Sequence, residues 1–126
     1  MEPFNQLKEA KFLNLETFRK NGNGVKTPVW FVQEGEVLYV RTIADSGKVK
    51  RIRNNQQVKV APCKANGDLT GGWAPGKAHE INGDQALMGK VDRLLSKKYG
   101  LRKVIFSVMW ALQGKQYTLI EIKPGT

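Results

Sequence analysis

The sequence predicts a mainly β domain of the α+β class, in which about six strands form a small barrel. Short runs rich in β-branched and aromatic residues recur along the chain, and turn signals rich in Gly and Asn separate them. Two amphipathic helical patterns lie close together just before the last of these runs. A length of 126 residues suits a single domain, 1–126, with a core of its own.

The first third of the chain is expected to form an antiparallel meander. Three runs favour strands, at residues 12–19, 25–33 and 37–42. The Asn-Gly-Asn-Gly turn signal at 21–24 and the Glu-Gly-Glu sequence at 34–36 connect them. Pro28 stands near the start of the second run, a position that strands tolerate.

A short helix is expected after the third strand, at about residues 46–55. Ser46 is a suitable N-cap, and Val49 and Ile52 lie three residues apart on one side of the helix. Two further strands are expected after this helix, separated by a turn-rich loop, at residues 57–63 and 73–81.

A helical pair is expected before the last strand. Apolar residues recur at helical spacing in residues 84–99, where Asp84 can cap the start and Gly100 can end the helix. The same pattern repeats in residues 101–113. Residues 115–123 alternate strictly between apolar and polar, which predicts the sixth strand. We expect this strand to pair with an early one, because an unpaired edge favours aggregation.

The composition excludes several kinds of active site. Cys63 is the only cysteine and His79 the only histidine, which excludes an internal disulfide and a cysteine-based zinc site and argues against a histidine-dependent catalytic centre. We therefore assign no catalytic residue and no metal ligand. The chain has no apolar run of membrane-spanning length, and its first residues do not resemble a secretory signal, so we expect a cytoplasmic protein.

The net charge of +10, from 21 basic and 11 acidic residues, predicts an anionic partner. Basic residues are densest in residues 41–55, which read RTIADSGKVKRIRNN. This segment has three interpretations: a solvated helix face, a nucleic-acid surface, or a seat for a small anion. Nucleic acid is the least favoured, because Trp30 and Phe31 would face opposite sides of a strand and no RNA-binding motif is present.

Two details favour the small anion. The cations stand at the start of the predicted helix, where the helix dipole disfavours them unless an anion joins them. Gly47 follows the cap, so backbone amides can approach a ligand closely. A phosphate at this point would meet the charge of Lys48 and the hydroxyl groups of Thr42 and Ser46.

The stretches TPVWFV and EGEVLYVRTIADSGKVKRIRNNQQVKVAPC resemble the pyridoxamine 5′-phosphate oxidase-like, FMN-binding split β-barrel family. They are closer to its flavin/deazaflavin (F420)-dependent oxidoreductase branch than to the oxidase itself. The resemblance covers residues 10–123 and implies a six-stranded split β-barrel. It also implies a homodimer with cofactor clefts at the interface, with FMN or coenzyme F420 as cofactor. Some members of the family bind haem or related tetrapyrroles instead.

The resemblance further implies which residues hold the cofactor. In the family, the backbone of the second strand lies beside the flavin ring, and here this is Pro28, Val29 and Trp30. A hydroxyl residue that ends the third strand and a Ser-Arg-Lys triplet at the helix start bind the phosphate, and here these are Thr42, Ser46, Gly47 and Lys48. Gly47 replaces the arginine of that triplet, and the cations that can compensate for it are Arg41, Lys50 and Arg51.

These expectations together predict an oxidoreductase that transfers hydride between FMN or F420 and a small molecule. Such an enzyme needs few catalytic side chains, because the cofactor supplies the hydride chemistry and the protein binds and orients it. The alternative is a non-catalytic split barrel that binds a flavin or a tetrapyrrole, and nucleic-acid binding ranks third. The final stretch YTLIEIKPGT lacks the Arg and His substrate residues of the oxidase, which argues against vitamin B6 oxidation.

Overall fold

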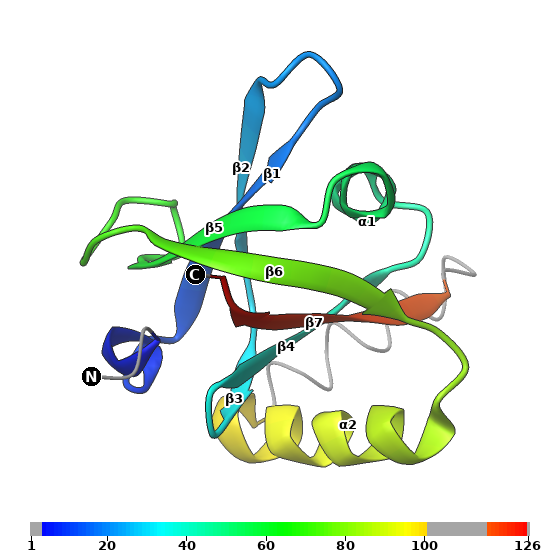
Figure 1. The fold of residues 1–126 in the computed structure, drawn as a ribbon. Coiled ribbons are helices and arrows are strands. Elements are labelled where there is room, and N and C mark those ends of the chain that lie inside the picture. Colours follow the sequence, from blue (N-terminus) through cyan, green and yellow to red (C-terminus); the bar gives the residue numbers. More distant parts are fainter. Residues whose placement is uncertain (1–3, 101–115, 126) are drawn as a thin grey trace.

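The computed structural model describes residues 4–100 and 116–125, and its strands form one seven-stranded antiparallel sheet (Figure 1). The strands are β1 (Phe12–Phe18), β2 (Gly24–Val29), β3 (Val32–Glu34), β4 (Val37–Ile43), β5 (Gln57–Cys63), β6 (Ala74–Ile81) and β7 (Tyr117–Pro124). The helical segments are a short 3₁₀ turn, η1 (Asn5–Leu7), and the α-helices α1 (Gly47–Asn54) and α2 (Gln85–Tyr99).

The order of the strands requires the sheet to curl. From edge to edge the order is β2-β1-β5-β6-β7-β4-β3, and every neighbouring pair is antiparallel. β2 and β3 are the two edges of the sheet, yet only Trp30 and Phe31 separate them in the chain. Because this link spans at most roughly 11 Å, the two edges must approach each other there. The sheet is therefore a half-barrel, and the expected mainly β architecture is confirmed.

The predicted count of six strands is wrong by one. We predicted one strand at 25–33, but the chain breaks at Trp30 and Phe31, and the two parts pair with different neighbours. The backbone of Phe31 explains the break, because its N–H donates to the Tyr99 hydroxyl at 3.1 Å. Its carbonyl accepts a hydrogen bond from Lys98 Nζ at 3.0 Å. Phe31 therefore directs its polar backbone groups to α2 and not to a neighbouring strand.

The mid-chain helix lies where the sequence predicts it, with shorter bounds. α1 is one residue shorter at each end than the range 46–55, and Ser46 occupies its N-cap position. Val49 and Ile52 are buried, as their spacing predicts. α1 contacts β1 and β6, so it covers the inner face of the curled sheet. Neither α1 nor α2, the two α-helices in the described part of the chain, has the length and apolar character needed to cross a membrane.

The C-terminal half of the described chain supplies α2 and the interior strand β7. Asp84 caps α2 as predicted, because its carboxylate accepts a hydrogen bond from the Leu87 amide at 3.0 Å. Gly100 ends the helix with a φ of 63°, a conformation that glycine adopts without strain. The second helix of the predicted pair, at 101–113, lies outside the described residues. β7 lies between β6 and β4, so the predicted pairing of the last strand with an early one is confirmed.

Two apolar clusters pack on the two faces of the sheet. The inner cluster fills the curl and includes Leu38 and Val40 of β4. The outer cluster joins the sheet to α2, and Tyr39 of β4 packs against it. Because side chains alternate along a strand, the even-numbered residues of β4 face the curl and the odd-numbered residues face α2. This alternation decides where the polar residues at the end of β4 point.

Candidate functional site

The end of β4 and the start of α1 bring a hydroxyl group and a half-buried cation together. Thr42 faces the curl, and only 5% of its surface is exposed. A tight connection follows, in which the Ser46 amide donates to the Ile43 carbonyl at 3.1 Å. The chain then turns back so that Lys48 Nζ donates to Thr42 Oγ1 at 3.2 Å. Three of the predicted phosphate residues, Thr42, Ser46 and Lys48, therefore lie at one place.

Arg51 adds a second cation to this place by lying over Gly47. A β-carbon at position 47 would lie only 2.8 Å from Arg51 Nη1. Arg51 Nε donates to Thr17 Oγ1 on β1 at 2.6 Å, which holds the side chain in this direction. The guanidinium group of Arg51 therefore lies over Gly47, the position at which the Ser-Arg-Lys triplet of the resembled family has its arginine. The spacing of four residues between Gly47 and Arg51 was a usable signal, because residues four apart are neighbours on a helix surface.

The two cations stand in an environment that disfavours their charge. Burial, and next the charge of Arg51, lower the pKa of Lys48 below its usual range. Burial, and next the charge of Arg19, lower the pKa of Arg51. Neither Lys48 nor Arg51 forms an ion pair with a carboxylate among residues 4–100 and 116–125. A bound anion would relieve the repulsion between these cations.

The N-cap residue adds hydrogen-bonding capacity. The Ser46 side chain makes no capping bond to α1, and its Oγ is buried with no hydrogen-bond partner in the described part of the chain. The amides of the first helical turn have no partner within a helix. Such amides and a hydroxyl group at a helix N-terminus suit the oxygens of a phosphate. Ser46, Lys48 and Arg51 thus combine two charges with neutral donors at one helix start.

The structure does not bring Arg41 to this place. As an odd-numbered residue of β4, Arg41 faces α2, where its Nη1 lies 2.5 Å from Asp92 Oδ1. Its guanidinium also stacks over the ring of Tyr117, 4.3 Å from the ring centre. Lys50 belongs to α1 and is exposed to solvent. The sequence grouped Arg41 with Thr42, although neighbours on a strand point to opposite faces.

The residues predicted to lie beside a flavin ring occupy the edge strand β2 and the link that follows it. Pro28 and Val29 end β2, which pairs with β1 and with no second strand among the described residues. Trp30 stacks on Tyr99 of α2, with ring centres 4.4 Å apart and planes inclined by 6°. Short-range sequence patterns do not reveal this role of Tyr99, because its partner Trp30 lies 69 positions earlier in the chain. The three predicted ring residues are therefore adjacent at an open sheet edge.

Known structures share this fold. No family model and no curated protein matches the sequence. HutZ, the haem storage protein from Vibrio cholerae, matches 100% of this chain and 92% of its own with 18% identity and a TM-score of 0.72. A candidate pyridoxamine 5′-phosphate oxidase from Listeria innocua matches 95% of this chain and 88% of its own, with 17% identity and a TM-score of 0.67. A structure named F420 reductase matches 96% and 92% of the two chains, with 17% identity and a TM-score of 0.60. The chain therefore has the split-barrel fold of pyridoxamine 5′-phosphate oxidase-like proteins, as the resemblance implied.

Proposed function

We propose that this protein binds a flavin or deazaflavin cofactor, FMN or F420, with a phosphate group at the start of α1. The observation that carries the proposal is a pair of mutually repelling cations, Lys48 beside Thr42 and Arg51 over Gly47, neither of which is paired with a carboxylate in the described ranges. Both cofactors carry the phosphate that such a seat would stabilise. The two charges, the buried hydroxyl of Ser46 and the first-turn amides fit the acceptor oxygens of a phosphate.

The ring of the cofactor would lie along β2, at Pro28, Val29 and Trp30. An edge strand has backbone N–H and C=O groups that no second strand uses, and a flavin ring can bind to such groups. The proposal includes a homodimer, in which a second copy of the chain completes the cleft on the open side of β2. The proposal gives Lys50 and Arg41 no direct contact with the phosphate. Lys50 is exposed on α1, and Arg41 is on the other face of β4, so both contribute only to the positive potential that attracts the cofactor.

The proposed reaction is hydride transfer between the cofactor and a small molecule. A bound flavin or deazaflavin supplies this chemistry itself, so the chain's own residues bind and orient it. The few reactive side chains of the protein agree with a role limited to binding and orienting the cofactor. Burial raises the pKa of the Cys63 thiol, which disfavours a thiolate nucleophile. His79 pairs with Glu121 at 3.0 Å, on β6 and β7.

The direct test is a titration of the purified protein with FMN and with F420, followed by fluorescence. Lys48→Ala is expected to weaken the binding of the preferred cofactor by about 10- to 100-fold, because a hydrogen bond to a charged group contributes about 1.5–3 kcal/mol. Lys59→Ala removes an exposed lysine of β5 and serves as the matched control, with no change expected. The assignment is wrong if neither cofactor binds at micromolar concentration and Lys48→Ala changes nothing.

A second candidate function is binding without turnover. It is favoured by the likeness to HutZ, which is described as a haem storage protein. An assay of hydride transfer from the reduced cofactor separates the two functions, because a storage protein would bind its ligand and give no transfer. Nucleic-acid binding remains third, and it predicts an affinity that falls steeply between two salt concentrations.

A further inference from the structure

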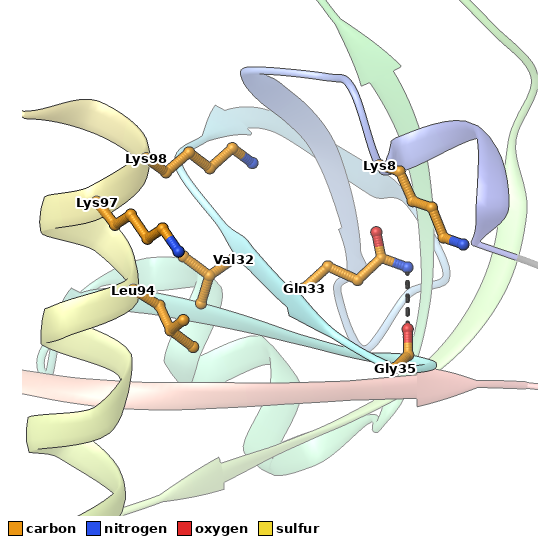
Figure 2. A pocket seen from close by; sticks show the side chains of 7 residues that line it. All are labelled: Lys8, Val32, Gln33, Gly35, Leu94, Lys97 and Lys98. Atoms are coloured by element: carbon orange, nitrogen blue, oxygen red, sulfur yellow. Dashed lines mark hydrogen bonds between the residues drawn. The ribbon is translucent and has the colours of Figure 1, made fainter.

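A second site lies at the opposite end of β4 from the proposed phosphate seat. A cavity of about 470 Å³ opens between the C-terminal turn of α2, strand β3 and the residue after η1 (Figure 2). Its lining residues are Lys8, Val32, Gln33, Gly35, Leu94, Lys97 and Lys98. Gly35 stands before the first residue of β4 and Thr42 near the last, so strand geometry places the two sites roughly 17 Å or more apart.

The lining is basic. Three of the seven lining residues are lysines and none is acidic. Three acidic residues adjoin lining residues in the sequence, Glu9, Glu34 and Glu36, but none of them lines the cavity, and Glu34 is paired with Lys90 at 2.5 Å. The dipole of α2 accounts for part of this charge, because cations are favoured in the last turn of a helix. Figure 2 shows Lys97 and Lys98 extending from α2 over β3.

Lys98 is held in a half-buried position without a carboxylate partner in the described ranges. Its Nζ donates to the Phe31 carbonyl at 3.0 Å and lies 3.5 Å from the centre of the Phe31 ring. These contacts fix the position of the ammonium group beside the cavity and leave it further hydrogens to donate. Burial lowers the pKa of Lys98 to about 8. An anion in the cavity would balance this charge.

Gln33 supplies an unused acceptor to the same cavity. Its Nε2 donates to the carbonyl groups of Phe4 and Gly35, each at 3.3 Å. These two acceptors decide the orientation of the amide, because the reverse orientation would place its oxygen against both carbonyls. Oε1 is then buried with no hydrogen-bond partner among the residues that the structure describes. In Figure 2 this oxygen points away from Gly35. A ligand with an N–H or O–H group would satisfy it.

We propose that this cavity binds a small organic anion that carries a carboxylate or phosphate, one hydrogen-bond donor and a short apolar part. Lys97 and Lys98 take the anionic group, Gln33 Oε1 accepts from the donor, and Val32 and Leu94 contact the apolar part. The volume lies within the usual range for small-molecule sites. This site does not depend on the cofactor site, since none of its residues belongs to β2, β4 or α1.

The test uses three matched probes, 4-hydroxybenzoate, benzoate and 4-hydroxybenzyl alcohol, in calorimetric and NMR titrations of the whole chain. We expect 4-hydroxybenzoate to bind more tightly than benzoate, and the neutral alcohol to bind at least about tenfold more weakly than 4-hydroxybenzoate. Comparable affinity for the alcohol and the two acids would refute an anion site. Failure of all three probes to saturate below 10 mM, about the weakest affinity worth assigning to a site, would overturn the proposal as well.

Variants locate the binding. Lys98→Met is expected to weaken the binding of 4-hydroxybenzoate about tenfold, whereas Lys64→Met, which removes an exposed lysine that does not line the cavity, leaves the affinity unchanged. Equal losses of affinity in these two variants would mean that the net charge of the protein alone attracts the anion, and would refute the proposal. Lys97→Met, at an exposed position, replaces Lys98→Met if the latter does not fold. Lys48→Ala is expected to keep full affinity, so a failed cofactor site and a failed anion site give different results.

Discussion

The Tyr99 hydroxyl is predicted to hold the link between the two sheet edges to the start of β1. It donates to the Lys11 carbonyl at 2.7 Å, just before β1, and accepts the Phe31 N–H at 3.1 Å, in the link between β2 and β3. Tyr99→Phe keeps the ring that stacks on Trp30 and removes only these bonds. Phe31 is fully buried, so its N–H cannot turn to water. Leaving such a donor unsatisfied costs about 1–3 kcal/mol.

We therefore expect Tyr99→Phe to lower the free energy of unfolding by about 2 kcal/mol in urea titrations. For a domain of this size the corresponding fall in Tm is about 8 °C. A loss smaller than about 0.5 kcal/mol would refute the reasoning, because it would mean that Phe31 is not held by this hydroxyl. Tyr99→Leu is the companion variant, and it should cost about 0.5–1.5 kcal/mol more through the lost stack on Trp30.

Three further predictions follow from single residues. Gly76→Ala should destabilise by about 1–3 kcal/mol in urea unfolding, because its β-carbon would lie 2.9 Å from Ile122 Cγ2, whereas Gly72→Ala, with open space around it, serves as control. The free energy of unfolding of the wild type should rise between pH 8 and 10, because in this range the unfolded chain binds the Lys98 proton more strongly than the folded chain does. In Lys98→Met the part of this increase that comes from Lys98 should be absent. Gly47→Ala should displace the Arg51 guanidinium and weaken cofactor binding in the fluorescence titration while changing unfolding by less than about 1 kcal/mol.

Local sequence patterns were enough to predict most of the helices and strands. The caps Ser46 and Asp84 and the apolar spacing of Val49 and Ile52 lead directly to α1 and α2. The run at 25–33 was misread as one strand, because its composition is that of a strand throughout. Its break depends on hydrogen bonds to residues that lie 67 and 68 positions away. Short-range patterns carry no information about partners at that distance.

Some residues of the candidate site could likewise be predicted from the sequence, and others could not. The grouping of Thr42, Ser46 and Lys48 was predictable, since a strand end, a cap and a helix start are consecutive in the chain. The prediction that groups Arg41 with Thr42 is wrong, because alternation along a strand already places the two side chains on opposite faces. The spacing of four residues puts Arg51 on the same side of α1 as Gly47, but the direction of its side chain over Gly47 required the structure, because Thr17 on another strand holds it there.

The sequence by itself determined the mainly β class, the helices α1 and α2 and a basic helix start suited to a phosphate. These follow from periodicity, capping and charge, which act between residues a few positions apart. Only the tertiary structure decided how the two sheet edges meet, that Arg51 lies over Gly47, and that a basic cavity forms beside α2. Those features come from contacts between distant segments, and such contacts form only when burial of the common core brings the segments together.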